Sequence, residues 1–333
     1  MNNEEFLEAI VSEAIFRIRR EYERTNGRIY LAFSGGKDST VLAHLIMMAN
    51  LPTKIPFVFS NTGIELDAML NFVKEFPYEN VQIVKPKKPF AQILKENGKP
   101  SVSKLKARYI SAYHRHIDDP LSLASCRELV TGIREKNGVQ MNESSMKRLA
   151  NKHMHFLHPD TEFKVSDSCC TYLKKKPFED YAKQNDMWGY YNGMRVSEGG
   201  VRSKVIKSCV NVTSKNGHEF YASTPIYDWT DEIIDMFIKK YNIRLSDAYE
   251  VYGCQRTGCC ACPFSKNVKK DLKVLYDYEP KKYKAMMYWM KDVYIYQEVE
   301  CDWDDEYMEE YNRMKPIIEQ RRKEMMDKYR KKD

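Results

Sequence analysis

One short stretch, residues 34–40, combines the residue types that hold a phosphate group. Its two adjacent glycines let the backbone close around a ligand without Cβ clashes, so that the N–H groups form a nest for anionic oxygens. Lys37 adds a positive charge, and Asp38 supplies a carboxylate of the kind that holds Mg²⁺ beside a phosphate. The predicted contacts are Ser34, Gly35, Gly36, Lys37, Asp38, Ser39 and Thr40. An ordinary glycine turn with a solvated lysine is the alternative.

A second set of reactive groups is formed by cysteines. Six of the nine cysteines gather in two short segments, 169–170 and 254–262. Cys169 and Cys170 are adjacent, which disfavours a disulfide between them, and Cys259 and Cys262 have the spacing of a metal knuckle or a redox pair. This pattern predicts metal or redox chemistry, although a structural zinc site and inert reduced thiols fit the spacing too.

Alternating strand and helix patterns surround residues 34–40. The predicted strands are 28–33, 55–63, 80–86, 189–196 and 219–229, and the predicted helices cover 3–24, the residues from the loop to about Ala49, and 68–76. Because strand, helix and strand follow at short spacing, we expect right-handed crossovers. The predicted fold class is α/β, with a parallel twisted sheet and helices on both faces. In such a sheet, ligands bind beyond the carboxyl ends of the strands, where the glycine loop opens a helix.

Two parts of the chain depart from this α/β pattern. Residues 100–160 look helical and basic, with ten Lys and Arg against six Asp and Glu. From about Phe264 the chain is helical and rich in lysine and tyrosine. We therefore predict an α/β domain formed by residues 1–99 and 161–264, a basic helical insertion over 100–160, and a helical C-terminal region over 265–333.

The composition limits the class of protein. The chain has 333 residues, 43% of them hydrophobic and 30% charged, which is typical of a soluble globular protein. No apolar run approaches the ~20 residues that span a bilayer, and the first residues lack the pattern of a signal peptide. We expect a cytoplasmic protein with no membrane partner and no disulfide framework. The net charge of +7 is compatible with anionic small molecules or with nucleic acid.

The sequence FSGGKDST, residues 33–40, resembles the pyrophosphate loop of the N-type ATP pyrophosphatases, a superfamily with the Rossmann-like, adenine nucleotide alpha-hydrolase-like fold. Three further segments resemble the PAPS (phosphoadenosine phosphosulfate) reductase family within that superfamily. They are FSNTGIELDAMLNFV (59–73), YNGMRVSEGGVRS (191–203) and STPIYDWTDEII (223–234). The resemblance covers most of residues 28–264 in the family's order. It implies that the chain binds an adenine nucleotide.

The resemblance also implies roles for particular side chains. The implied nucleotide contacts of the second strand loop are Asn61, Thr62, Gly63 and Glu65. A simple turn is the alternative for Asn61 and Thr62. Arg195 and Arg202, beside Glu198, would act on the phosphates together with Lys37 and Asp38, because paired arginines suit a bidentate anion site. Surface charges are the alternative for both arginines.

The order of the cysteines, Cys-Cys followed later by Cys-x-x-Cys, resembles the [4Fe-4S] ligand pattern of APS (adenylyl sulfate) reductases. The implied ligands are Cys169, Cys170, Cys259 and Cys262, with Zn²⁺ as the alternative metal. Cys254 or Cys260 could replace one of these ligands. Since ligation by two adjacent cysteines is strained, one of that pair could instead be a nucleophile.

Two departures from the PAPS reductase pattern bear on the substrate. The reductases carry a late catalytic cysteine in a Glu-Cys-Gly-Leu context, whereas the last cysteine here, Cys301, lies in VECDWDD, where carboxylates raise a thiol pKa. The reductases also tend to have a degenerate phosphate loop, and this loop is intact. Both departures favour ATP over PAPS or APS.

The leading expectation is therefore an enzyme of sulfur chemistry that uses Mg²⁺ and ATP to adenylylate an acceptor, after which sulfur displaces AMP. DNA phosphorothioation enzymes and tRNA thiolases of the superfamily make a nucleic acid the candidate acceptor. The other expected partners are a sulfur donor protein or a thiol reductant, and the candidate assembly is a homodimer. The alternatives are a PAPS or APS reductase that forms sulfite, and a nucleotide- or nucleic-acid-binding regulator without turnover.

Overall fold

The chain folds into two compact units, each built from two separate stretches of sequence. The computed structural model describes residues 2–116, 118–136, 139–141, 148–158, 161–198, 208–215 and 218–329. The first unit, here called the sheet unit, comprises Met1–Lys87 and Leu173–Gly258. The second, the helical unit, comprises Lys88–Tyr172 and Cys259–Asp333, and so joins the predicted insertion to the predicted C-terminal region.

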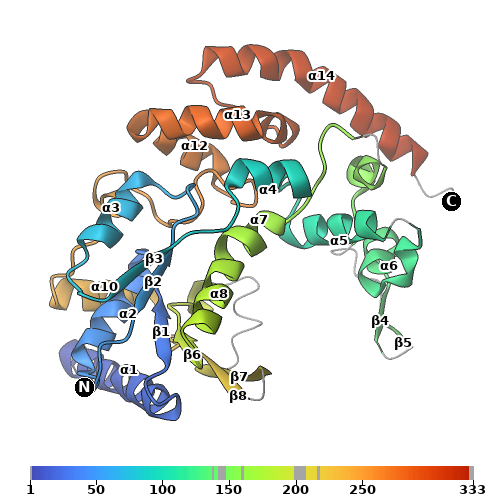
Figure 1. The fold of residues 1–333 in the computed structure, drawn as a ribbon. Helices are drawn as coiled ribbons and strands as arrows, with labels where there is room; N and C mark the ends of the chain where they lie inside the picture. The colour runs from blue at the N-terminus through green and yellow to red at the C-terminus, as the bar shows by residue number, and fades with distance from the viewer. Residues whose placement is uncertain are drawn as a thin grey trace. The chain divides into compact units, whose positions relative to one another are not determined.

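The sheet unit contains one six-stranded sheet with the strand order β3-β2-β1-β6-β8-β7 (Figure 1). The strands are β1 (Ile29–Ala32), β2 (Phe57–Ser60), β3 (Val81–Val84), β6 (Gly189–Tyr191), β7 (Val210–Lys215) and β8 (His218–Ser223). All neighbours are parallel except β7, which runs antiparallel to β8 at the edge. The predicted parallel sheet is thus confirmed. The edge strand β7 was not predicted.

Helices cover both faces of this sheet (Figure 1). They are α1 (Asn3–Arg24), α2 (Lys37–Met48), α3 (Asp67–Glu75), α8 (Lys176–Gln184), α10 (Asp231–Lys240) and the short α11 (Asp247–Glu250), with a 3-10 turn at Val196–Glu198. Alternation along β1 sends Ile29 and Leu31 into the core shared with α1, α2, α3 and α10, and Tyr30 into a smaller core under α8. The predicted α/β class with helices on both faces is confirmed.

The strand order reverses beside β1. From β1 the chain adds β2 and β3 on one side, and β6 later adds the other half of the sheet on the opposite side. The loops that leave the carboxyl ends of β1 and β6 therefore diverge. In an open parallel sheet, this divergence creates the crevice in which ligands bind.

The helical unit is built almost entirely from helices. Its first stretch holds α4 (Phe90–Asn97), α5 (Lys104–Arg115), a 3-10 turn (Pro120–Ser122), α6 (Ala124–Thr131), a small antiparallel pair β4 (Arg134–Lys136) and β5 (Val139–Met141), a 3-10 helix (Asn151–Leu157) and α7 (Ser168–Cys170). Its second stretch holds α12 (Val268–Tyr278), α13 (Pro280–Tyr296) and α14 (Asp305–Lys328). A π-helical turn, Thr171–Lys175, continues the chain from α7 into α8. The β4–β5 pair was not predicted.

The two stretches of the helical unit are joined by side-chain hydrogen bonds. His153 Nδ1 lies 2.6 Å from the Tyr296 hydroxyl, and the Asn151 amide donates to the Tyr329 carbonyl at 3.0 Å. The 3-10 helix of the insertion is therefore held against α13 and the end of α14. Among the described helices, none is both long and apolar enough to cross a membrane.

Candidate functional site

A cavity of about 660 Å³ lies in the sheet unit at the carboxyl edge of the sheet. Its walls are the glycine loop after β1, the loop after β6, the first turns of α10, and residues from Tyr249 to Thr257. This is the crevice that the strand order predicts. Of the residues predicted to bind the nucleotide phosphates, Ser34, Gly36, Lys37, Asp38, Ser39 and Arg195 line it.

The glycine loop is closed by its own hydroxyl groups. The Ser34 and Ser39 hydroxyls lie 2.9 Å apart, and Ser39 donates to the Gly36 carbonyl at 2.9 Å. Gly35 has φ +69°, a left-handed backbone conformation that residues with a side chain rarely adopt. This conformation explains why the turn has a glycine. Gly36 is the N-cap of α2 and has no side chain to satisfy the first amides. The loop thus presents backbone donors at a helix N-terminus.

Two of these donors already have partners, and the first is the Gly36 N–H, which donates to the Ser34 hydroxyl at 3.3 Å. The Lys37 backbone N–H donates to the Tyr249 hydroxyl at 3.0 Å, and that hydroxyl lies 2.8 Å from the Thr257 hydroxyl. Burial raises the pKa of Tyr249, so the group stays a neutral hydroxyl. An oxygen atom therefore occupies the position beside the Lys37 amide where a phosphate oxygen would bind. Sequence reasoning missed Tyr249 and Thr257, because neither belongs to a recognisable pattern.

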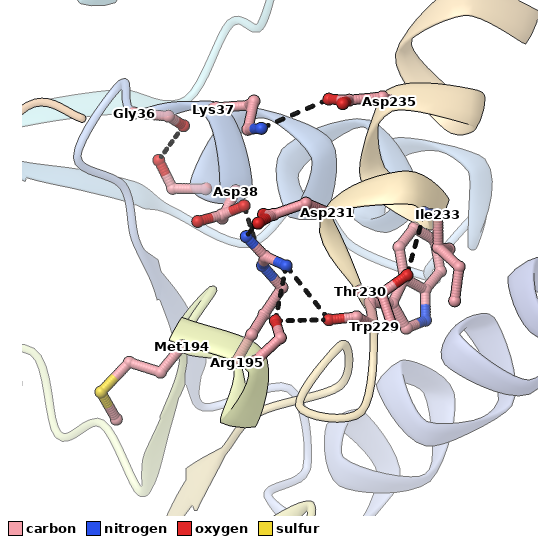
Figure 2. Close-up of polar contacts among 12 residues, drawn as sticks. Gly36, Lys37, Asp38, Met194, Arg195, Trp229, Thr230, Asp231, Ile233 and Asp235 are labelled. Carbon is pink, nitrogen blue, oxygen red and sulfur yellow. Dashed lines mark hydrogen bonds and ion pairs between the residues drawn. The ribbon is translucent and has the colours of Figure 1, made fainter. Parts of the chain in front are cut away.

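Arg195 connects three parts of the cavity wall (Figure 2). Its guanidinium is only 3% exposed and donates to Asp38 Oδ1 at 3.0 Å and to Asp231 Oδ1 at 2.6 Å. It also donates to the Ser197 hydroxyl at 2.8 Å and to the Trp229 carbonyl at 3.1 Å. The hydrogen bond from Arg195 lowers the pKa of the Asp231 carboxyl. Arg195 thereby ties the first turn of α2 to the first turn of α10.

Lys37 reaches across the same cavity. Its Nζ atom lies 3.3 Å from Asp235 Oδ1 on α10 (Figure 2). Asp231 and Asp235 were not predicted as site residues, although Asp231 lies in the segment 223–234 that carries the family resemblance and Asp235 directly follows it. Arg202 lies outside the described residues, as does the side chain of Glu198. The roles predicted for Arg195 and Asp38 toward phosphate and Mg²⁺ stay predictions.

Gly193, in the loop after β6, explains how closely the two walls approach. A Cβ atom at this position would lie 2.9 Å from the Asp38 carbonyl carbon and 3.0 Å from the Ser39 nitrogen. Backbone atoms cannot move aside as a flexible side chain can, so only glycine fits. Sequence reasoning did not single out Gly193, because a loop glycine does not reveal which backbone it approaches.

The predicted contacts of the second strand loop do not line this cavity. Thr62 donates its hydroxyl to Glu65 Oε1 at 2.6 Å and its backbone N–H to Glu65 Oε2 at 3.0 Å. The Gly63 N–H donates to Asn61 Oδ1 at 3.1 Å. These bonds close a local turn, and the contact of these residues with a nucleotide stays a prediction. Two residues of the glycine loop, Gly35 and Thr40, do not line the cavity either. The Thr40 hydroxyl donates to the Gly35 carbonyl at 3.3 Å and so stabilises the loop.

The four predicted metal-binding cysteines all lie in the helical unit. Cys169 is buried, and the pKa of its thiol is raised well above its ordinary value. The first cause is a hydrogen bond with Cys170, followed by burial and by the nearby charges of Cys170, Cys262 and Cys259. The four thiols are therefore near enough to interact electrostatically, although they are far apart in the sequence. Each of the nine cysteines in the described chain is a reduced thiol.

The four cysteines are chemically suited to bind a metal through thiolate ligands. Four thiols that repel one another as anions are stabilised by a metal cation, which deprotonates them outright. Within the described residues, however, no three or more His, Cys, Asp or Glu side chains form a group arranged to hold a metal ion. The prediction of a [4Fe-4S] cluster or of Zn²⁺ therefore stays a prediction.

Cys301 lies in the same unit and is completely buried. Burial raises the pKa of its thiol to about 12, and the Asp304 carboxylate contributes to that increase. A thiol with this pKa is almost entirely protonated at neutral pH, so it is a poor nucleophile. The expectation drawn from VECDWDD agrees with this environment, with burial as the larger cause.

Comparison with known proteins identifies a domain family. The model of the phosphoadenosine phosphosulfate reductase domain matches residues 28–115 and 114–265. No curated protein sequence matches the chain.

Several solved structures match the chain at low sequence identity. The PAPS reductase from Candida auris, in a phosphate complex, is 12% identical with a TM-score of 0.43, covering 78% of this chain and 96% of that one. The FMN adenylyltransferase from Candida glabrata, with FAD and inorganic pyrophosphate, is 14% identical with a TM-score of 0.43, covering 76% of this chain and 62% of that one. The U34-tRNA thiolase of Methanococcus maripaludis, with its [4Fe-4S] cluster, is 14% identical with a TM-score of 0.36, covering 86% and 80%.

Proposed function

Because the chain belongs to the phosphoadenosine phosphosulfate reductase domain family, we propose that it is an adenine-nucleotide-dependent enzyme of sulfur chemistry that uses ATP to adenylylate an acceptor. The observation that carries the proposal is the intact glycine loop, whose Gly36 and Lys37 line a cavity of about 660 Å³ at the carboxyl edge of the sheet. That volume lies within the range of small-molecule sites.

In the proposed reaction, ATP places its phosphates on the loop of residues 34–40. An oxygen of the acceptor attacks the α-phosphorus, the new O–P bond forms, and the bond to the β-phosphate breaks. Pyrophosphate leaves with the bonding electron pair, while the Lys37 ammonium and the loop amides stabilise the negative charge that develops. A sulfur nucleophile then displaces AMP from the adenylylated acceptor.

Asp38 and Arg195 have complementary roles in this proposal. Arg195 uses the Oδ1 atom of Asp38, and among the described residues no hydrogen bond or ion pair to Oδ2 is found. Asp38 would hold Mg²⁺ through that second oxygen. Arg195, bonded to Asp38 and Asp231, positions the two carboxylates in the wall that would face the phosphates.

A metal group would be held by Cys169, Cys170, Cys259 and Cys262. A [4Fe-4S] cluster bound there would supply redox or sulfur-carrying chemistry, and Zn²⁺ would supply only structure. The chain's own contribution is to bring two thiol pairs from distant segments together in one unit.

The acceptor is proposed to be a nucleic acid. Residues 100–160 carry an excess of Lys and Arg over Asp and Glu, which favours a polyanionic partner. Sulfite formation from PAPS or APS is the second candidate reaction. The buried, protonated state of Cys301 argues against it, since the reductases need a late reactive cysteine.

Two measurements separate these reactions. Calorimetric titration should show ATP binding that depends on Mg²⁺, and Lys37→Ala should weaken it roughly ten- to hundredfold, the effect of losing one charge-assisted hydrogen bond. Sulfite release from PAPS or APS, with thioredoxin as reductant, should stay at trace level. Rapid sulfite release that disappears in Cys301→Ala would overturn the ATP assignment in favour of the reductase.

A further prediction concerns the Tyr249 hydroxyl. Because this hydroxyl accepts the Lys37 N–H, a phosphate oxygen must displace it to bind that amide. Tyr249→Phe removes the competitor and should raise ATP affinity about two- to tenfold, the range for one neutral hydrogen bond. Tyr241→Phe, at the far end of α10, serves as the matched control. A weaker affinity in Tyr249→Phe would show that the hydroxyl contacts the nucleotide instead.

A further inference from the structure

The helical unit contains a second cavity, of about 470 Å³, that the proposed ATP reaction does not use. It lies between the end of α4, one face of α5, and the residues from Lys164 to Tyr172. The polar side chains that line it come from both sides, including Arg108, Ser111 and Arg115 on α5 and Lys164, Ser168 and Thr171 opposite.

Helical spacing places the α5 side chains on one face. Arg108, Ser111 and Arg115 are three and then four residues apart, so they are neighbours on the helix surface. His114 is oriented beside them, because its Nε2 atom lies 2.7 Å from the Phe156 carbonyl oxygen and must donate to it. The face is therefore cationic and rich in hydrogen-bond donors.

The opposite wall is held by backbone pairing. The Lys99 N–H donates to the Lys164 carbonyl at 2.7 Å, and the Ser166 N–H donates to the Lys99 carbonyl at 2.9 Å. Gly98, with φ +95°, permits this approach, since a Cβ atom there would lie 2.6 Å from the Lys164 carbonyl oxygen. The cavity thus has a rigid second wall before any ligand arrives.

The charges in the cavity do not cancel. Its two carboxylates are already paired, Glu96 with Lys88 at 2.5 Å and Asp167 with Arg108 at 3.0 Å. Arg115 and Lys164 are exposed, and no carboxylate of the described residues forms an ion pair with either. Two cations therefore face the cavity without a protein counter-ion, which favours an anionic ligand.

The wall of the cavity contains the segment that carries two of the predicted metal-binding cysteines. Asp167 and Ser168 immediately precede Cys169 and Cys170, and Thr171 immediately follows them. The Ser168 hydroxyl accepts from Ser166 at 2.7 Å, which leaves its own proton to donate to a ligand. An anion in the cavity would thus be bound by residues adjacent in sequence to the thiols.

We propose that this cavity binds a phosphate group through Arg115, Lys164 and the hydroxyls beside the cysteine pair. The proposal goes beyond the ATP reaction, because it concerns a separate phosphate site within the helical unit and does not depend on which nucleotide occupies the glycine loop. The phosphate group could belong to the backbone of a nucleic acid or to free inorganic phosphate.

The test uses the full-length protein with its ATP site saturated by a non-hydrolysable ATP analogue. One probe is a fluorescein-labelled single-stranded oligonucleotide, followed by anisotropy, and the other is inorganic phosphate, followed by phosphorus NMR line broadening. The test variant is Arg115→Glu with Lys164→Glu. The matched control is Lys281→Glu with Lys284→Glu, which makes the same charge change at exposed positions of α13 in the same unit.

The cavity variant should lose at least tenfold in oligonucleotide affinity while the control changes less than about twofold. In a plot of the logarithm of oligonucleotide affinity against the logarithm of salt concentration, the slope should become shallower by about 1.4. Each of the two lost single-strand phosphate contacts contributes about 0.7. Loss of phosphate line broadening with unchanged oligonucleotide binding would assign the site to free phosphate. Equal behaviour of the cavity variant and the control toward both probes would overturn the proposal.

Folding is checked by circular dichroism and thermal unfolding. Both side chains are exposed, so the variant should fold. If the charge reversal nevertheless lowers the melting temperature strongly, Arg115→Gln with Lys164→Gln removes the two charges and keeps polar, though shorter, side chains. The double glutamine variant should still bind the oligonucleotide or inorganic phosphate more weakly than the wild-type protein. Wild-type binding of both probes by this variant would also refute the site.

Discussion

Replacing Gly36 by valine should abolish ATP binding while the protein stays folded. A Cβ atom at Gly36 would lie 3.2 Å from the Ser34 and Thr257 hydroxyls and 3.3 Å from the Tyr249 hydroxyl. These are the ends of side chains that can shift, and Gly36 has φ −68°, which valine adopts without strain. The two added methyl groups would nevertheless fill the space in which phosphate oxygens approach the loop amides.

Gly36 is a better test position than Gly35. A side chain at Gly35 would require φ +69° and would place its Cβ 2.9 Å from a Val73 methyl group in the core, so loss of binding there could reflect misfolding. Calorimetric titration with ATP measures the effect, and circular dichroism confirms the fold. Gly36→Ala, which adds a single carbon, should give an intermediate loss. If folded Gly36→Val bound ATP with wild-type affinity, the loop would be an ordinary strand-to-helix turn and not a phosphate-binding nest.

The second large effect is expected at the cysteines. Protein purified without oxygen should be brown, with a broad absorbance shoulder near ~400 nm from iron–thiolate charge transfer. Cys259→Ser with Cys262→Ser should remove both the colour and the bound iron, because a serine hydroxyl does not replace a thiolate ligand. Cys209→Ser, a cysteine of the sheet unit outside the set, should retain them.

Metal analysis decides between the candidate metals. Colourless protein with one equivalent of zinc would contradict the cluster and leave a structural site. Protein that carries neither iron nor zinc would show that the thiols bind no metal. Cys260→Ser tests whether this more buried cysteine replaces one of the assigned ligands.

Local patterns were enough to predict most of the sheet unit. Apolar periodicity located α1, α2 and α3, and short apolar runs located β1 and β2, because these elements bury continuous faces in one core. The edge strand β7 was missed because its exposed side chains lack that signal. The joining of residues 88–172 to residues 259–333 was also missed, because no local pattern encodes contacts between such distant segments.

The residues of the candidate site also fall into those that local sequence patterns predict and those that only the fold brings together. The glycine loop is a contiguous stretch and could be read directly from the sequence. Tyr249, Thr257 and Gly193 meet that loop from other parts of the chain, through single hydroxyl bonds or through the absence of a side chain. Such partners become visible only when the fold brings the segments together.

The discontinuity of both units has a consequence for how the protein is made. The ribosome delivers β1, β2 and β3 first, and the partner of β1 on its other side, β6, follows only after the whole of residues 88–172. At about 5–20 residues per second, the edge of a central strand stays open for on the order of ten seconds. Open edges pair with other chains, so the interruption of the sheet unit by residues 88–172 lengthens the time during which the nascent chain is prone to aggregate.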